Sequence, residues 1–285
     1  MADALVLDGV TKRYPNGRGI KNVSFSVPKG EIFGFLGPNG AGKTTTIRTI
    51  MDFMRPDKGT ITILDLDAHD SSVTAKYRIG YVPADRQLYP NWTGEKHLAL
   101  YRSMRPKSKL DVSKKLNLDI HTPVKHLSTG NKQKLAIALA LCGQPDLLIM
   151  DEPTAGLDPL LQQAIYEILA KYKQAGGTIF LSSHNLGEVE KICDRVGIIK
   201  DGRIVADRTM QDIRDMNIHE VSVVSDKPLA LTLANVQVIH ETTNHTSLRV
   251  TGDLNPLLSQ LAKHKVADLE ITHASLEDIF LEFYS

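Results

Sequence analysis

The chain has 285 residues, with 34 Lys and Arg against 33 Asp and Glu, which gives a formal charge of +1. Proteins that bind the nucleic-acid backbone usually carry a clear excess of basic residues, so this charge balance argues against a nucleic-acid partner. Hydrophobic residues make up 42% and charged residues 24% of the chain, as in ordinary globular proteins and unlike disordered ones.

Neither a targeting segment nor a membrane span is visible in the sequence. The first ten residues contain Asp3 and Asp8 and lack the basic and apolar regions of a signal peptide. The most apolar runs, at 135–142 and 147–150, are far shorter than the roughly 20 residues that span a bilayer. Cys142 and Cys193 form no C-x-x-C motif. We therefore expect an intracellular chain in a reducing cytosol.

Short runs with strand character alternate with helical patterns over residues 1–214. The run from Leu147 to Met150 is continuously apolar, as expected for a strand that is buried on both faces of a parallel sheet. This alternation predicts an α/β domain in which helices connect parallel strands. Strands are expected at 31–36, 60–64, 147–150 and 178–182, and helices at 43–54, 131–142 and 160–175.

Two segments depart from this alternation. Residues 88–127 lack a strand signal and predict a helical insertion with helices at 93–105 and 112–116, so that a helical subdomain spans about 88–142. Residues 215–285 predict a separate small α+β appendage. Its strands are expected at 221–224, 236–239, 247–250 and 267–271, and its helices at 256–263 and 275–283.

A glycine-rich loop with the pattern G-x-x-x-x-G-K-[S/T] lies between the first expected strand and the first expected helix, which is the context that phosphate binding requires. Its glycines let the backbone approach a phosphate, and the helix N-terminus presents free N–H groups to it. Lys43 supplies a positive charge for the β- and γ-phosphates, and the Thr44 hydroxyl is placed to bind Mg²⁺. The predicted ATP-binding residues of the loop are Gly37, Pro38, Asn39, Gly40, Ala41, Gly42, Lys43, Thr44 and Thr45.

Acidic residues end the buried strand at 147–150. Asp151 and Glu152 lie at the carboxyl edge of the sheet, where open α/β sheets bind ligands, and strand alternation predicts that they point opposite ways. We expect Asp151 to hold Mg²⁺ together with Thr44, and Glu152 to accept a proton from the attacking water. His184 follows a neighbouring strand and is expected to reach the γ-phosphate. The predicted catalytic residues are therefore Glu152, His184 and Lys43.

These motifs together resemble those of the ATP-binding cassette (ABC) ATPases. The sequence L-S-T-G-N-K-Q at 127–133 is similar to the family's signature motif, and it lies between the phosphate loop and the D-E-P sequence, as in the family. The resemblance implies that Ser128, Gly130 and Gln133 contact the ATP held by a second copy, in a head-to-tail homodimer. Tyr14 is similar to the aromatic residue that stacks on adenine in this family.

The ending at 274–284 resembles the short tail on ATPase subunits of bacterial antibiotic, drug and sodium exporters. The resemblance implies an ATP-hydrolysing subunit at the cytoplasmic face of the membrane, bound to a separate membrane-spanning permease. One rival is a family member that acts on ribosomes or in DNA repair, although the chain has a single cassette and no long coiled coil. Another rival is an ATP sensor with slow turnover.

Two departures from the family pattern leave open the interpretation that the chain is an ATP sensor with slow turnover. Ala84 stands where the family has glutamine or glutamate, so either Asp85 or Gln87 substitutes, or the coupling to the membrane partner is altered. Thr129 and Asn131 stand where glycine and glutamine are usual in the signature motif. The β-branched Thr129 places extra bulk near the expected phosphate.

Overall fold

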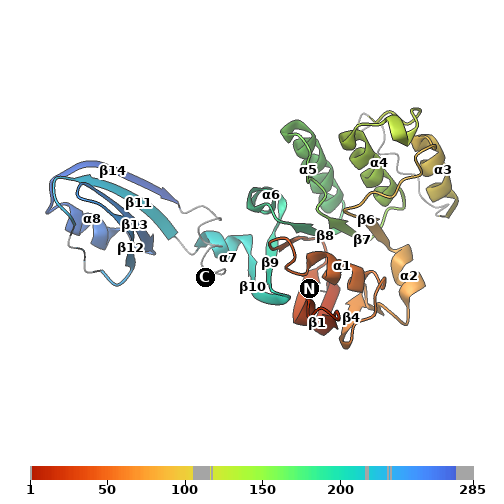
Figure 1. Cartoon of the computed structure of the whole chain (residues 1–285), viewed down its shortest axis with the longest axis horizontal. Coiled ribbons are helices and arrows are strands. Elements are labelled where there is room, and N and C mark those ends of the chain that lie inside the picture. The colour runs from red at the N-terminus through yellow and green to blue at the C-terminus, as the bar shows by residue number, and fades with distance from the viewer. Residues whose placement is uncertain are drawn as a thin grey trace. The chain divides into compact units, whose positions relative to one another are not determined.

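The computed structural model describes residues 2–104, 116, 118–215, 218–229, 231 and 233–273. The chain divides into two compact units, Met1–Arg208 and Thr209–Ser285, which are drawn in Figure 1. The helices expected at 112–116 and 275–283, and the exporter-like tail at 274–284, lie outside the described residues, apart from Leu116. Among the described residues, none of the helices is both long enough and apolar enough to cross a membrane.

A six-stranded sheet forms the centre of the first unit, in the order β10–β9–β3–β8–β7–β6. β3 (Ile32–Leu36) pairs in parallel with β8 (Thr178–Ser183), which pairs in parallel with β7 (Leu147–Asp151). All residues of these three strands are buried, and the predicted α/β class is confirmed. The remaining strands of this sheet are β6 (Ile79–Val82), β9 (Arg195–Lys200) and β10 (Arg203–Thr209).

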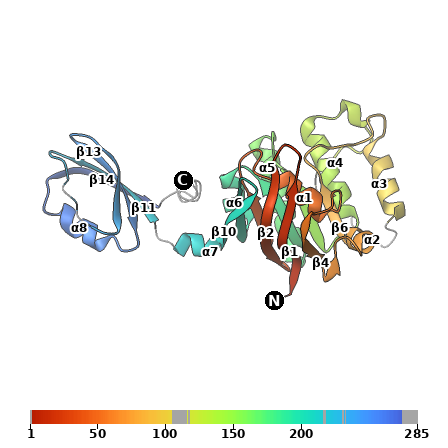
Figure 2. The same ribbon diagram turned by 60° about the horizontal axis from the view of Figure 1, so that its bottom comes forward.

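A second, antiparallel sheet has the order β2–β1–β4–β5, and the sequence analysis did not predict most of it. Figure 2 shows β1, β2 and β4 of this sheet side by side. Phe25 of β2 stacks on Phe33 and Phe180 of the central sheet, with ring centroids 5.2 and 5.7 Å away, so the main core lies between the two sheets. The strands are β1 (Asp3–Arg13), β2 (Gly19–Pro28), β4 (Lys58–Ile63) and β5 (Leu66–Asp67).

Four helices of the first unit follow the predicted positions with shifted ends, whereas the helices at Ser72–Tyr77 and Leu186–Ile192 were not predicted. α4 begins at Thr129, because the Ser128 Oγ atom accepts a hydrogen bond from the Asn131 N–H group and caps the helix there. Leu98 of α3 packs against Leu135 and Leu139 of α4 in a small core of its own, as expected for a helical insertion. The helices are α1 (Lys43–Ile50), α2 (Ser72–Tyr77), α3 (Gly94–Met104), α4 (Thr129–Cys142), α5 (Pro159–Gln174) and α6 (Leu186–Ile192).

The second unit contains a four-stranded antiparallel sheet in the order β12–β13–β11–β14. Leu257 and Leu261 of α8 pack with Val221, Val223 and Leu248 in a core that is separate from that of the first unit. Each strand expected from the sequence lies within one of these four. The elements are α7 (Met210–Asp215), β11 (Ile218–Ser225), β12 (Val236–Glu241), β13 (His245–Thr251), α8 (Asn255–Leu261) and β14 (Val266–His273).

Candidate functional site

The carboxyl ends of β3, β8 and β7 meet at one edge of the central sheet. The parallel register pairs Leu36 with Ser183 and Asp151 with Ser182. The Gly37 N–H group donates to the Ser183 carbonyl at 3.3 Å, and the Glu152 N–H group donates to the Ser182 carbonyl at 3.2 Å. The phosphate loop, the D-E-P turn and the His184 segment therefore leave the sheet next to one another, where open parallel sheets bind ligands.

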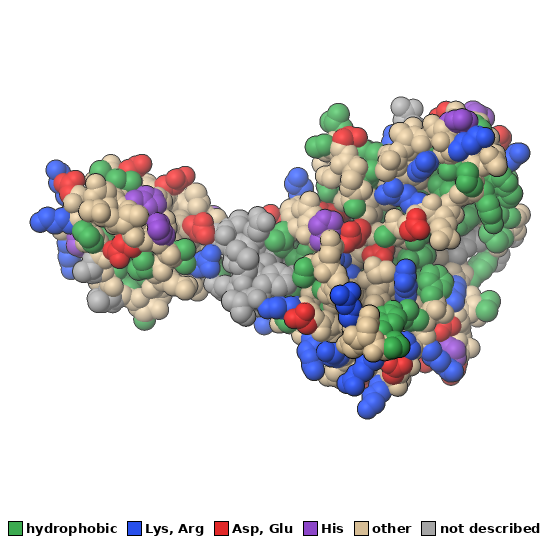
Figure 3. Space-filling view, viewed as in Figure 1, with side chains coloured by type: hydrophobic (Ala, Val, Ile, Leu, Met, Phe, Trp, Pro, Cys, Tyr) green, Lys and Arg blue, Asp and Glu red, His purple; other side chains and the backbone are tan. Residues whose placement is uncertain are grey.

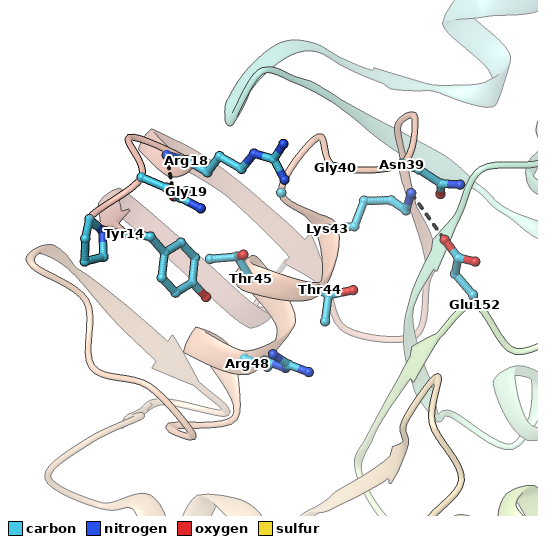
Figure 4. Close-up of a pocket in the computed structure, with 13 residues that line it drawn as sticks. Tyr14, Arg18, Gly19, Asn39, Gly40, Lys43, Thr44, Thr45, Arg48 and Glu152 are labelled. Atoms are coloured by element: carbon cyan, nitrogen blue, oxygen red, sulfur yellow. Dashed lines mark hydrogen bonds and ion pairs between the residues drawn. The ribbon is translucent and has the colours of Figure 1, made fainter.

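The glycine-rich loop borders a cavity of about 620 Å³, within the usual size range of ligand sites. Gly42 caps α1 with a φ of 115°, a left-handed conformation that glycine adopts without steric cost, and the free N–H groups of the helix begin there. Lys43 is buried, and its Nζ atom donates to the carbonyls of Gly37 at 2.7 Å and Pro38 at 3.2 Å. The cavity is lined by Tyr14, Pro15, Asn16, Arg18, Gly19, Asn39, Gly40, Gly42, Lys43, Thr44, Thr45, Arg48 and Glu152 (Figure 4).

The two ends of this cavity differ in character. Figure 4 shows Tyr14 beside Thr45 at one end, and Lys43 and Glu152 pointing toward one another at the other. The Tyr14 hydroxyl donates to the Met54 Sδ atom at 3.2 Å. One end thus offers an aromatic ring, and the other offers a cation, a carboxylate and the N-terminus of a helix.

Two arginines that the sequence analysis missed, Arg18 and Arg48, also line the cavity. Arg48 lies one helical turn after Thr44, so helix periodicity could have placed it on the same face as the loop. Arg18 lies in the turn between β1 and β2, where no motif marked it. Three of the predicted loop residues, Gly37, Pro38 and Ala41, do not line the cavity, and Ala41 is 4% exposed and packs into the main core.

Glu152 lies between the other two predicted catalytic residues, Lys43 and His184. Its Oε1 atom lies 3.3 Å from Lys43 Nζ, and its Oε2 atom lies 3.1 Å from His184 Nδ1. Glu152 has a φ of 49°, so the backbone leaves the strand at this residue in a left-handed turn. Such conformations are costly for residues with a side chain and cluster at functional sites.

Asp151 and Glu152 have different surroundings because of that turn rather than through strand alternation alone. Asp151 is the last residue of β7, is 2% exposed and accepts a hydrogen bond from the Ser182 Oγ atom at 2.6 Å. Asp151 and the exposed Thr44 hydroxyl offer hard oxygen donors, which suit Mg²⁺. The part of the chain that the structure describes contains no group of three His, Cys, Asp or Glu placed to hold a metal. This donor set fits an ion that is held mainly by phosphates and water.

The signature residues border a different hollow, of about 590 Å³, which shares no lining residue with the cavity at Lys43. Ser128 caps α4 at one side of this hollow, and Asp158 caps α5 at the other. A Cβ atom on Gly130 would lie 2.6 Å from the Leu161 Cδ2 atom, so a larger residue there would have to push the end of the Leu161 side chain aside. Ser128 and Gly130 therefore lie where a ligand reaches them from outside the chain.

Gln133 requires a correction, because it was predicted to contact ATP and its side chain is fully buried. Its Nε2 atom donates to the Pro153 carbonyl at 2.5 Å, and its Oε1 atom accepts from the Arg86 Nε atom. Gln133 thus joins the signature helix to the turn after Glu152 and to the loop that follows β6. Ala84 in that loop is exposed, and it is Arg86 that reaches inward.

In comparisons with known proteins, this chain is similar to ATP-binding proteins of ABC transporters and related bacterial systems. The family model for ABC transporters matches residues 20–155. The ABC transporter ATP-binding protein YcbN of Bacillus subtilis is 38% identical over 83% of this chain and 82% of its own length. The Nod factor export ATP-binding protein I of Ralstonia nicotianae is 33% identical over 97% and 92% of the two chains. The linearmycin resistance ATP-binding protein LnrL of Bacillus subtilis is 31% identical over 97% of each.

Solved structures show the same cassette fold. An ATP-binding subunit of an ABC transporter superimposes with a TM-score of 0.68 and 33% identity, over 74% of this chain and 92% of that one. A dimeric ATP-binding cassette in a post-hydrolysis state, bound to ADP and Pi, superimposes with a TM-score of 0.66 over 72% and 98%. At 24% identity, the second likeness speaks for the fold alone.

Proposed function

The chain belongs to the family of ABC transporter ATP-binding proteins, and we propose that it hydrolyses ATP to drive export through a separate membrane-spanning protein. It is an ATPase subunit of the bacterial exporter type. The names of two similar proteins, for Nod factor export and for linearmycin resistance, support the direction of transport. One observation carries the catalytic assignment: Glu152 lies 3.3 Å from Lys43 and 3.1 Å from His184, at the mouth of the phosphate-loop cavity.

ATP occupies the cavity with its adenine on the Tyr14 ring and its phosphates on the loop at 37–45. The aromatic end and the cationic end of the cavity match the two ends of the nucleotide. The N–H groups at the start of α1 bind the phosphate oxygens. Arg18 and Arg48 add positive charge beside the triphosphate.

Glu152 accepts a proton from the water that attacks the γ-phosphate. General-base catalysis needs the carboxylate within hydrogen-bond reach of that water, and Glu152 is 24% exposed at the cavity. His184 holds the same carboxylate from the other side and orients the attacked phosphate. Lys43 stabilises the negative charge that develops on the transferred group, which is the main source of catalysis in phosphoryl transfer.

Thr44 and Asp151 would hold the magnesium ion that accompanies ATP. The Thr44 hydroxyl lines the cavity, and the Asp151 carboxylate lies one residue before Glu152. When bound, Mg²⁺ would neutralise part of the negative charge of the phosphates. The hydrogen bond from Ser182 fixes the Asp151 carboxylate in the orientation it needs.

Two copies of the chain pair head to tail, so that Ser128 and Gly130 of one copy complete the nucleotide site of the other. The support is that the signature hollow and the cavity at Lys43 share no residue within one chain. The N-terminus of α4 then points free N–H groups and the positive end of a helix dipole at the γ-phosphate. In this assignment residues 1–214 form the nucleotide-binding domain and 215–285 form the appendage.

The membrane partner docks on the helical subdomain at the cytoplasmic face. Leu100, Tyr101 and Met104 of α3 are 37%, 38% and 55% exposed, so this helix presents several apolar side chains to solvent. Figure 3 shows hydrophobic side chains gathered on the part of the first unit that carries α3. This apolar surface suits a helical segment of a membrane protein.

Purification of the tagged chain from detergent-solubilised native membranes tests this partner. We expect a protein with several transmembrane spans to co-purify, and the double variant Tyr101→Glu, Met104→Glu to lose it. Val73→Glu serves as the matched control, because Val73 is 86% exposed but lies on α2. Recovery of the chain without any membrane protein, or equal recovery with both variants, would count against the proposal.

A further inference from the structure

Glu188 is a buried carboxylate that the proposed chemistry does not use. It lies on α6, in the helix that follows His184, and its side chain is 3% exposed. Among the described residues, the only other acidic side chain that is buried is Asp151. Because an unpaired buried carboxylate is costly, its partners indicate why it is there.

Two hydroxyl groups from two separate segments satisfy this carboxylate. The Thr154 Oγ1 atom donates to Glu188 Oε1 at 2.7 Å, and the Ser183 Oγ atom donates to Glu188 Oε2 at 2.6 Å. Thr154 is 4% exposed and Ser183 is 2% exposed, so both bonds are shielded from water. Bonds of this length to a carboxylate are among the stronger ones in proteins.

A simple helix cap does not explain Glu188. Asn185 caps α6, and its Oδ1 atom accepts a hydrogen bond from the Glu188 N–H group at 3.3 Å. In a capping box the glutamate would reach back to the N–H group of the cap residue. Here the Ser183 Oγ atom accepts from that group at 2.9 Å instead. The Glu188 side chain is thereby free to reach Thr154 on the D-E-P turn.

The two hydroxyl donors lie beside the two residues that meet at 3.1 Å in the site. Ser183 directly precedes His184, and Thr154 is the second residue after Glu152. We propose that Glu188 is a positioning residue, which ties these two segments together and so fixes the distance between the Glu152 carboxylate and the His184 imidazole. This inference rests on the proposed roles of Glu152 and His184.

The test compares Glu188→Ala, Glu188→Gln and Glu190→Gln in the full chain, with kcat and KM for ATP measured well below the unfolding temperature. A misplacement of about 1 Å costs roughly a hundredfold, so Glu188→Ala should lower kcat by ten- to a hundredfold while KM stays within about twofold. Glu188→Gln retains one acceptor oxygen and should recover part of the loss. Glu190 is exposed on the same helix, and its variant should match the wild type.

A double-mutant cycle separates positioning from loss of structure. Thr154→Val should lower kcat by itself and should add little once Glu188→Ala has already broken the connection. A kcat of Glu188→Ala within twofold of the wild type, or additive losses in the cycle, would overturn the inference. Failure of the proposed function would give a different result, because Glu152→Gln, measured in parallel, would then turn over ATP as fast as the wild type.

Discussion

The Glu152 Oε2 atom lies 3.1 Å from the His184 Nδ1 atom, across the ends of two neighbouring strands. The parallel register of β7 and β8, which pairs Asp151 with Ser182, brings these distant parts of the sequence together. The left-handed turn at Glu152 then aims its carboxylate at the cavity that Lys43 enters from the other side. A carboxylate, a cation and an imidazole thus converge beside the phosphate loop.

Tyr14→Ala should raise KM for ATP about tenfold and leave kcat nearly unchanged, because stacking of a base on an aromatic ring contributes roughly 1–3 kcal/mol. Tyr14→Phe keeps the ring and loses only the hydrogen bond to Met54, so its KM should stay close to that of the wild type. Steady-state ATPase assays measure both variants. Equal increases in KM for the two would show that the hydroxyl group, rather than the ring, matters.

Glu152→Gln should form a stable dimer in the presence of ATP, because the nucleotide is retained between the cavity of one copy and the signature hollow of the other. Adding Ser128→Arg should keep the chain monomeric, since the arginine fills that hollow. Size-exclusion chromatography with light scattering gives the mass. Thr74→Arg, at an exposed position on α2, is the control. A dimer that survives Ser128→Arg would place the interface elsewhere.

Arg86→Ala should destabilise the first unit by about 1–3 kcal/mol, because it leaves the buried Gln133 Oε1 atom without its donor. Urea unfolding followed by the fluorescence of Trp92, the single tryptophan, reports on this unit. Gln87→Ala changes an exposed neighbour and should have little effect. If both variants unfold at the same urea concentration, the hydrogen bond from Arg86 contributes nothing to stability.

Glu188 should make the chain less stable as the pH rises. Its pKa is raised from 4.5, chiefly because burial disfavours the carboxylate; Glu152 adds to the shift, while hydrogen bonds from Ser183 and Thr154 and the charge of His184 oppose it. The native state then holds a proton that the unfolded state releases. Stability therefore falls as the pH rises from 4.5 toward the native pKa, and it stays lower above that pKa.

The comparison of wild type with Glu188→Gln tests that pH dependence. The free energy of unfolding should fall more in the wild type than in the variant as the pH rises above 4.5, because the variant cannot ionise at this position. Glu190→Gln should behave as the wild type does. Identical pH profiles for the wild type and Glu188→Gln would show that this carboxylate ionises alike in both states.

The edge of the sheet that carries the candidate site was predictable because local patterns mark it. A buried apolar strand precedes both the turn that contains Glu152 and the turn that contains His184. A glycine-rich loop between a strand and a helix is typical of phosphate binding. Parallel strands end at a common edge, so Asp151 and His184 were expected near the loop. In the structure these segments lie together, because the Gly37 and Glu152 N–H groups donate hydrogen bonds to the carbonyls of Ser183 and Ser182 at the end of β8.

The remaining features depend on tertiary packing, which no local spacing reports. Of the antiparallel sheet only the strand at 60–64 was predicted, although the alternation in residues 23–27 is also a strand signal. Gln133 is the last residue of the signature motif, yet the packing of α4 buries it against Pro153. Glu188 has the spacing of a capping box, and only the contact to Thr154 shows its other use. Arg18 reaches the cavity from a turn without any motif.

ATP turnover of the purified chain and of Glu152→Gln tests the central claim most directly, with Glu167→Gln, an exposed glutamate on α5, as the control. We expect the wild type and Glu167→Gln to hydrolyse ATP at equal rates. Glu152→Gln should lose at least a hundredfold in kcat, since general-base catalysis contributes roughly 10²–10⁴-fold, while its Kd for ATP stays within about threefold. Equal turnover by the wild type and Glu152→Gln, or no turnover by the wild type with or without its membrane partner, would contradict the account.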